Sequence, residues 1–165
     1  MADPPVAGID ANVFLGVLLP DAMIMGDANI AGAERVLQAL RDGALLGIST
    51  AMLLAEIKWA FARHGRTGFE IAEQVLLHDF RKTLQIVDIT PRLAILAAEL
   101  RARYYSRQND ISYNDCLYIA AALEARADFI ISSDPHLLQV TDIRTIEPKN
   151  FPLQETPHEH SNDFR

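Results

Sequence analysis

The chain places the apolar run VAGI, residues 6–9, directly before Asp10, and this stretch decides the fold that we expect. The run follows Pro4-Pro5, and a short apolar run between turn residues and a charge is typical of a buried strand. A similar run, DFIISS at residues 128–133, leads to Asp134. Helical patterns alternate with such runs along the chain. This alternation predicts an α/β fold with a mostly parallel sheet and helices on both faces.

The other elements follow from the spacing of apolar residues. The sequence predicts strands at residues 6–10, 45–49, 84–87, 145–146 and in the run that ends at Asp134. It predicts helices at about residues 12–19, 31–41, 52–63, 68–79, 91–104 and in the stretch that Asp115 opens. Ser49 or Thr50 is a natural N-cap for the helix at 52–63, and residues 21–29 are expected to form a loop.

Length and composition favour one folded domain. The chain has 165 residues, half of them apolar, which is enough for one sizeable core. We expect the domain to span residues 1–146. Residues 147–165 are polar and interrupted by prolines, so we expect a flexible C-terminal tail. Its histidines, His158 and His160, could contact a metal, but histidines in a mobile tail are more often solvated.

Charge and cysteine content exclude some classes of protein. The formal net charge of −7 argues against a surface coated for nucleic acid, although a local basic rim is compatible with it. The single cysteine, Cys116, rules out an internal disulfide and a cysteine-based zinc site, and its apolar surroundings favour a buried hydrophobe. The sequence contains no signal-peptide pattern and no apolar run long enough to span a bilayer. We therefore expect a cytoplasmic protein without a membrane partner.

Four acidic residues are the candidate site: Asp10, Glu56, Asp115 and Asp134. Two of them end strand-like runs, and the other two lie near the starts of helices. Ligands bind in open α/β sheets at this carboxyl edge. Clustered carboxylates repel one another unless they bind a cation or a proton, and hard oxygen ligands suit Mg²⁺ or Mn²⁺. The natural chemistry of such a site is a metal-activated water attacking a phosphodiester.

Two polar residues are candidates for a supporting role. Asn12 could hydrogen-bond Asp10 or a metal-bound water, but an Asn after a strand is more often a capping residue. Ser132 could orient a carboxylate or a water, but a Ser at a strand end is usually a turn residue.

A basic and aromatic rim is a weaker hypothesis. The arginines and lysine near the acids that could bind a phosphate backbone are Lys58, Arg63, Arg66, Arg101, Arg103 and Arg107. The tyrosines that could stack on RNA bases are Tyr104, Tyr105 and Tyr113. Solvated charge and core packing are the ordinary alternatives for each of these side chains.

The residues around the four acids resemble the motifs of PIN-domain ribonucleases. The matching stretches are IDANVFL at 9–15, STAMLLAE at 49–56, YNDCLYIAAA at 113–122 and ISSD at 131–134 with Leu137 after it. They keep the family's order and spacing over residues 6–146. Ala11 and Ser132 stand where the family commonly has Thr, and leucines replace an aromatic residue after Asp134. No acid is lost, so the resemblance implies an intact catalytic set.

The resemblance implies an α/β/α sandwich, a PIN-like nuclease domain over residues 1–146, and endoribonuclease activity with Mg²⁺ or Mn²⁺. A short single-domain member resembles the toxin of a VapC-type toxin–antitoxin pair. Such toxins are typically homodimers that a small antitoxin protein neutralises near the acidic site.

Two alternatives remain at this stage. The first is a non-catalytic PIN-like module that binds RNA or protein. The second is a metal nuclease that acts on DNA, because RNA and DNA offer the same phosphate chemistry and no linear motif reads the 2′-OH.

Overall fold

The computed structural model describes residues 2–152 and contains one five-stranded sheet. The strands are β1 (Val6–Ile9), β2 (Leu46–Thr50), β3 (Leu84–Val87), β4 (Phe129–Ile131) and β5 (Thr145–Ile146). Their order across the sheet is β3-β2-β1-β4-β5, and every neighbouring pair is parallel. All the carboxyl ends of the strands therefore lie along one edge.

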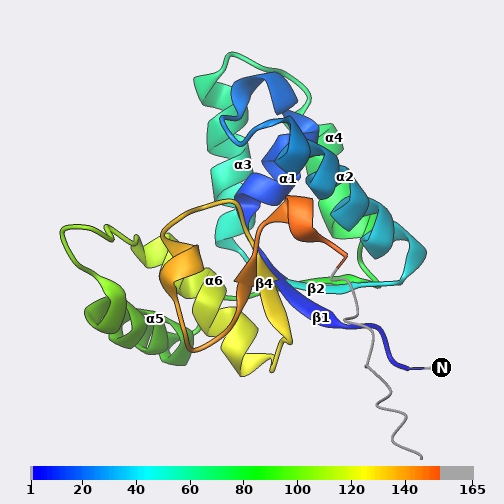
Figure 1. Cartoon of the computed structure of the whole chain (residues 1–165). Helices are drawn as coiled ribbons and strands as arrows, with labels where there is room; N and C mark the ends of the chain where they lie inside the picture. Colours follow the sequence, from blue (N-terminus) through cyan, green and yellow to red (C-terminus); the bar gives the residue numbers. More distant parts are fainter. Residues whose placement is uncertain (1, 153–165) are drawn as a thin grey trace, which may run out of the picture.

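Within residues 2–152, six α-helices surround the sheet (Figure 1). They are α1 (Ala11–Leu18), α2 (Asp27–Asp42), α3 (Met52–Arg63), α4 (Phe69–Gln74), α5 (Pro91–Tyr104) and α6 (Tyr113–Glu124). A π-helical turn, Val75–Asp79, continues α4. No helix within residues 2–152 is long and apolar enough to cross a membrane.

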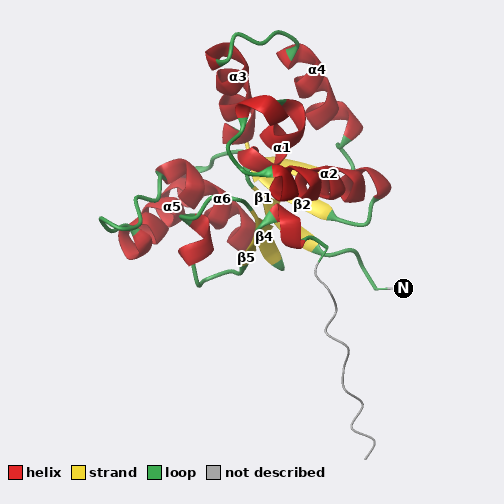
Figure 2. Cartoon of the chain, turned by 45° about the horizontal axis from the view of Figure 1, so that its top comes forward, coloured by secondary structure: helices red, strands yellow, loops and turns green. Residues whose placement is uncertain are grey.

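The helices form two layers with the sheet between them, as Figure 2 shows. Helices α1 to α4 pack around one apolar core, which includes Ile9, and helices α5 and α6 around a second. Helix α6 lies very close to the central strand, because a Cβ at Gly8 would be 2.8 Å from the Cβ of Ala122. The expected α/β/α sandwich is confirmed, and its sheet is entirely parallel.

The topology brings β1 and β4 together. Strand β1 pairs on one side with β2, the next strand along the chain. On its other side it pairs with β4, in the register Ile9↔Ile131. The crevice outside the carboxyl ends of strands at such a switch point is the usual place for a ligand. Asp10 directly follows β1, so it lies at this crevice.

Several predicted elements agree with the structure, others are shifted by one residue at an end, and three details differ more. Helix α3, strand β3 and strand β5 have the predicted bounds. Helix α2 begins at Asp27, inside the predicted loop, because Gly26 with φ +80° reverses the chain just before it. Strand β4 ends at Ile131, so Asp134 lies in the following loop. Ser49 and Thr50 belong to β2, and the N-cap of α3 is Ala51, although Oγ1 of Thr50 accepts a 3.3 Å hydrogen bond from the backbone N–H of Met52, the first residue of the helix.

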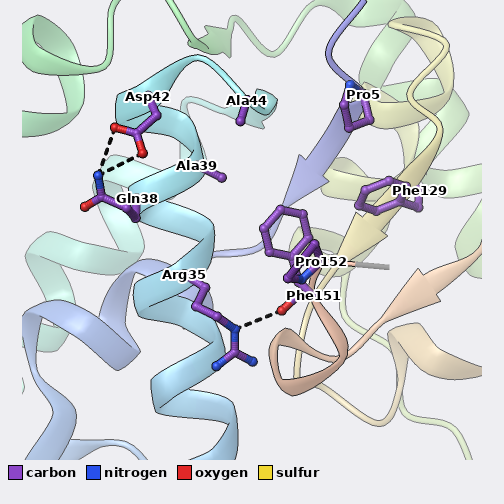
Figure 3. A pocket seen from close by; sticks show the side chains of 9 residues that line it. All are labelled: Pro5, Arg35, Gln38, Ala39, Asp42, Ala44, Phe129, Phe151 and Pro152. Atoms are coloured by element: carbon purple, nitrogen blue, oxygen red, sulfur yellow. Dashed lines mark hydrogen bonds between the residues drawn. The ribbon is translucent and has the colours of Figure 1, made fainter. Parts of the chain in front are cut away.

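The chain stays packed beyond residue 146, where the sequence predicts the tail to begin. The turn Pro148–Asn150 lies against α2 at Gly32, whose lack of a side chain makes room for the Pro148 backbone. Arg35 Nε donates a 3.0 Å hydrogen bond to the carbonyl of Phe151, beside an apolar hollow (Figure 3). Phe151 itself is buried. The remainder of the predicted tail, residues 153–165 with both histidines, lies outside the described residues.

Candidate metal centre

The four predicted acids lie at the carboxyl edge of the sheet and line one cleft. Asp10 follows β1, Asp134 lies in the loop after β4, Asp115 is in the first turn of α6, and Glu56 is in the second turn of α3. Carboxylate oxygens of Asp10, Asp115 and Asp134 all lie within 4.8 Å of one another. Glu56 is outside this triad but close enough to interact electrostatically with its members.

Ser132 holds the most buried of these carboxylates. Its Oγ donates a 2.6 Å hydrogen bond to Oδ2 of Asp10, which is only 5% exposed. The same Oγ accepts hydrogen bonds from Asn12 Nδ2 at 3.2 Å and from the backbone N–H of Asp134 at 3.0 Å. Asp10 makes no side-chain cap to α1, although it is the N-cap residue. The buried hydroxyl therefore connects both strand ends and orients Asp10 toward the other acids.

Asp115 is held by the start of its own helix. Ser112 is the N-cap of α6, and Asp115 three residues later completes a capping box. Oδ2 of Asp115 accepts from the backbone N–H of Ser112 at 2.9 Å and from its hydroxyl at 2.7 Å. The first turn of a helix also favours a negative charge. Local sequence is thus sufficient to place this carboxylate.

Glu56 and Asp134 each accept a hydrogen bond at one carboxylate oxygen. Tyr118 of α6 donates from its hydroxyl to Oε2 of Glu56 at 2.9 Å. Oδ1 of Asp134 accepts from the backbone N–H of His136 at 2.8 Å. His136 is in turn bonded through Nδ1 to Asn109, a buried residue, at 2.8 Å.

The site disfavours ionisation of Asp10, Glu56 and Asp115. Burial, with a smaller contribution from the charges of Asp115, Glu56 and Asp134, raises the pKa of Asp10 to about 8, although the Ser132 hydrogen bond opposes this. Burial also raises the pKa of Glu56 and of Asp115, against the hydrogen bonds from Tyr118 and Ser112. Carboxylates without a basic partner in a buried cluster take up a proton or a cation.

The donor set fits a hard divalent cation. Oδ1 of Asp10, Oδ1 of Asp115 and Oδ2 of Asp134 accept no hydrogen bond from any residue between 2 and 152. Each aspartate of the triad is therefore anchored through one oxygen and presents the other. Carboxylate oxygens alone, without sulfur or imidazole, match the preference of Mg²⁺ or Mn²⁺.

The acids line a cleft of about 480 Å³. Its other lining residues include Ile24, Trp59, Arg63 and His64. The sequence analysis did not name Trp59 as a candidate for the site. It lies three residues after Glu56, which places both side chains on one face of the helix. This spacing is the sequence signal from which Trp59 could have been predicted to lie near the acids.

Most of the expected basic and aromatic rim lies elsewhere. Of the six predicted cations, Arg63 lines the cleft. Three others pair with acids and do not line the cleft, in the pairs Lys58–Glu70, Arg66–Asp21 and Arg103–Asp142. Arg101 lies between the rings of Tyr105 and Tyr113, 4.6 Å from each centroid. The hydroxyl of Tyr104 is bonded to Asp142, so none of the three tyrosines lines the cleft.

Comparison with known families agrees with this geometry. The model of the PIN domain matches residues 9–143 of the chain. The chain belongs to the PIN domain family. The match begins one residue before Asp10 and ends after Asp134, so it includes all four acids of this PIN domain.

Solved structures share the fold at low sequence identity. The PIN domain is similar to a chain of VapBC2 from Rickettsia felis bound to a DNA fragment from its promoter, with 15% identity and a TM-score of 0.59, covering 86% of this chain and 98% of that one. It is also similar to a chain of FitAB bound to the IR36 DNA fragment, with 15% identity and a TM-score of 0.59, covering 94% and 99%. A comparison with curated proteins gives no match.

Proposed function

We propose that this PIN domain is a metal-dependent endoribonuclease and the toxin of a toxin–antitoxin pair. One observation carries the proposal: three aspartates from separate segments bring carboxylate oxygens within 4.8 Å of one another at the edge of the sheet. Such a cluster is costly in a protein that does not use it, because burial and like charge both oppose ionisation. Membership of a family of nucleases gives the cluster its chemistry.

The four acids are assigned to the metal and to catalysis. Asp10, Glu56, Asp115 and Asp134 would hold Mg²⁺, and Mn²⁺ would substitute because it prefers the same oxygen ligands. When bound, the ion supplies activation of water and stabilises charge on the phosphate oxygens during hydrolysis of an RNA phosphodiester.

The neighbouring hydroxyls keep the acids in place. Ser132 anchors one oxygen of Asp10, and Asn12 steadies that serine. Tyr118 anchors Glu56 from the opposite helix layer. These contacts fix rotamers before substrate arrives, so that little reorganisation is needed at the reacting phosphate.

The toxin assignment draws support from the structural neighbours. Both are chains of two-component complexes, VapBC2 and FitAB, that were solved on DNA. We propose by analogy that a small antitoxin protein binds this chain and blocks the acidic cleft, and that the toxin acts as a homodimer in the cytoplasm on RNA.

A cleavage assay on single-stranded RNA tests the enzyme directly. We expect cleavage with Mg²⁺ or Mn²⁺, none with EDTA, and none from Asp10→Asn, whose amide keeps the shape but not the charge. Single-stranded DNA of the same sequence shows whether the 2′-OH matters. If the wild-type protein binds RNA without cutting it under all these conditions, it is a non-catalytic PIN-like module.

A further inference from the structure

Trp59 is an exposed aromatic side chain that lines the acidic cleft. It is the only tryptophan of the chain, and 66% of it is exposed. An indole exposed to this degree is unusual, since large aromatic residues are mostly buried on average. Within the described residues, no lysine or arginine makes a cation–π contact with its ring. The rings of Phe69, Tyr105 and Tyr113, in contrast, each have a basic partner.

Helix α3 arranges acid, aromatic ring and base in sequence along the cleft. Glu56, Trp59 and Arg63 are spaced three and four residues apart, so they lie on one face of the helix. Glu56 and Arg63 are two turns apart, about 10 Å along the axis, and Trp59 lies between them. All three line the cleft that holds the carboxylate cluster. This order places an aromatic face between a candidate metal centre and a cation.

The basic end of the cleft is available to a phosphate. Arg63 and the adjacent His64 line the cleft, and within residues 2–152 neither forms an ion pair with an acid. Ile24, which is fully exposed, adds another apolar side chain to the lining. A flat ring with a cation beyond it matches a nucleotide, whose base has a π-face and whose next phosphate is anionic.

We propose that Trp59 is a stacking platform for an unpaired RNA base next to the cleaved phosphate, and that Arg63 binds the following phosphate. The proposal deepens the ribonuclease assignment and rests on it for the choice of RNA. A base within a duplex has both faces stacked, so the platform selects single-stranded RNA. Stacking on an indole tolerates every base, which makes Trp59 a determinant of strand state more than of sequence.

The single tryptophan makes the test direct. The intrinsic fluorescence of the wild-type protein in EDTA is titrated with a short single-stranded oligoadenylate, with a duplex of the same length, and with an abasic oligonucleotide that has the same number of phosphates. We expect strong quenching by the single strand and little by the other two. Equal quenching by the abasic strand would show phosphate binding without stacking and would overturn the proposal.

Substitutions at the same position separate stacking from folding. Trp59→Leu should weaken single-strand binding, and raise the KM for its cleavage, roughly tenfold, as expected for the loss of one base–aromatic stack. Trp59→Phe should restore most of the loss. Tyr105→Leu is the matched control, because that tyrosine is also half-exposed but lies outside the cleft, and it should behave as wild type. Melting curves confirm that each variant is folded.

The outcomes distinguish this inference from the proposed function. Cleavage by Trp59→Leu with wild-type KM would refute the platform and leave the nuclease intact. Quenching by single strands without any cleavage would keep the platform and refute the nuclease. If dilution of the protein alone shifts the emission of Trp59 and RNA does not, a second copy of the chain covers this surface and the inference is wrong.

Discussion

Tyr118 donates a 2.9 Å hydrogen bond to Glu56 although the two residues lie 62 positions apart and on helices from opposite faces of the sheet. Helix α3 alone would leave the Glu56 side chain free to choose among rotamers. The tyrosine is 2% exposed, so its ring is fixed by packing and its hydroxyl can select one position of the carboxylate. The hydrogen bond couples the two helical layers at the carboxyl edge of the sheet.

The first prediction removes this hydroxyl. Tyr118→Phe should keep the fold, lose on the order of 1 kcal/mol of stability, and reduce RNA cleavage about tenfold, because a half-buried carboxylate loses its partner. Denaturant unfolding and initial cleavage rates measure the two effects. The control is Tyr104→Phe, which removes a hydroxyl bonded to Asp142 away from the cleft. A fall in activity as large in that control would mean general destabilisation.

The second prediction concerns pH in the absence of metal. Burial raises the pKa of Asp10 to about 8, from 3.8 for the free side chain. Between these values the native state binds more protons than the unfolded state, so the stability that the protonated group contributes is complete below about pH 4 and is lost as pH rises toward 8. Glu56 and Asp115 have pKa shifts of the same direction.

In EDTA the free energy of unfolding should therefore fall between pH 5 and pH 8, with a contribution from Asp10 of up to about 1.4 kcal/mol per pH unit. Asp10→Asn should flatten this slope and be more stable than wild type near pH 8. Denaturant titrations at several pH values provide the measurement. A variant with the wild-type slope would show that Asp10 ionises normally.

The third prediction concerns the metal. Mn²⁺ or Mg²⁺ should raise the melting temperature relative to EDTA, since a ligand of the native state stabilises by mass action, by about 2.7 kcal/mol at one hundred times its Kd. The gain should be larger at pH 8 than at pH 5, where protons compete for the acids. Asp10→Asn should lose most of the gain. Superimposable wild-type melting curves with and without Mn²⁺ would contradict the site.

Much of this architecture could be predicted from sequence because its signals are local. The buried strand before Asp10 and the helix at 52–63 follow from short apolar patterns, and the capping box at Ser112 and Asp115 is a spacing of three. The contacts of Ser132 and Tyr118 could not be predicted with the same certainty. They join residues more than sixty positions apart, and the adjacency of β1 and β4 has to be known first.

The packing of the C-terminal turn could not be predicted from local sequence. Pro148 and Phe151 stand in a polar stretch that reads as a tail, yet both are buried against α2. The partner that makes this possible is Gly32, whose missing side chain admits the Pro148 backbone at a distance that any Cβ would block. The residues at 147–152 do not by themselves predict this contact, because it depends on the glycine in α2.

The fourth prediction tests Ser132, the buried hydroxyl between β1 and β4. Ser132→Ala leaves the Asp10 carboxyl without its donor and should cost about 1–3 kcal/mol in apo stability at neutral pH and most of the activity. Ser49→Ala is the control, because that buried hydroxyl bonds the carbonyl of Ile9 and touches no acid. Equal activity in both variants would remove Ser132 from the site.

The last prediction compares acids inside and outside the cluster. Asp115→Ala and Glu56→Ala should each reduce RNA cleavage by at least a hundredfold, whereas Glu99→Ala, on the exposed part of α5, should leave it unchanged. If the protein is a toxin, induced expression of the wild type and of Glu99→Ala should arrest growth, and Asp115→Ala should not, because arrest requires turnover of RNA. Immunoblots establish equal expression. Arrest by the Asp115→Ala protein at the wild-type level would point instead to a mechanism based on binding, since removal of a carboxylate from the centre of the cluster leaves the rest of the surface in place.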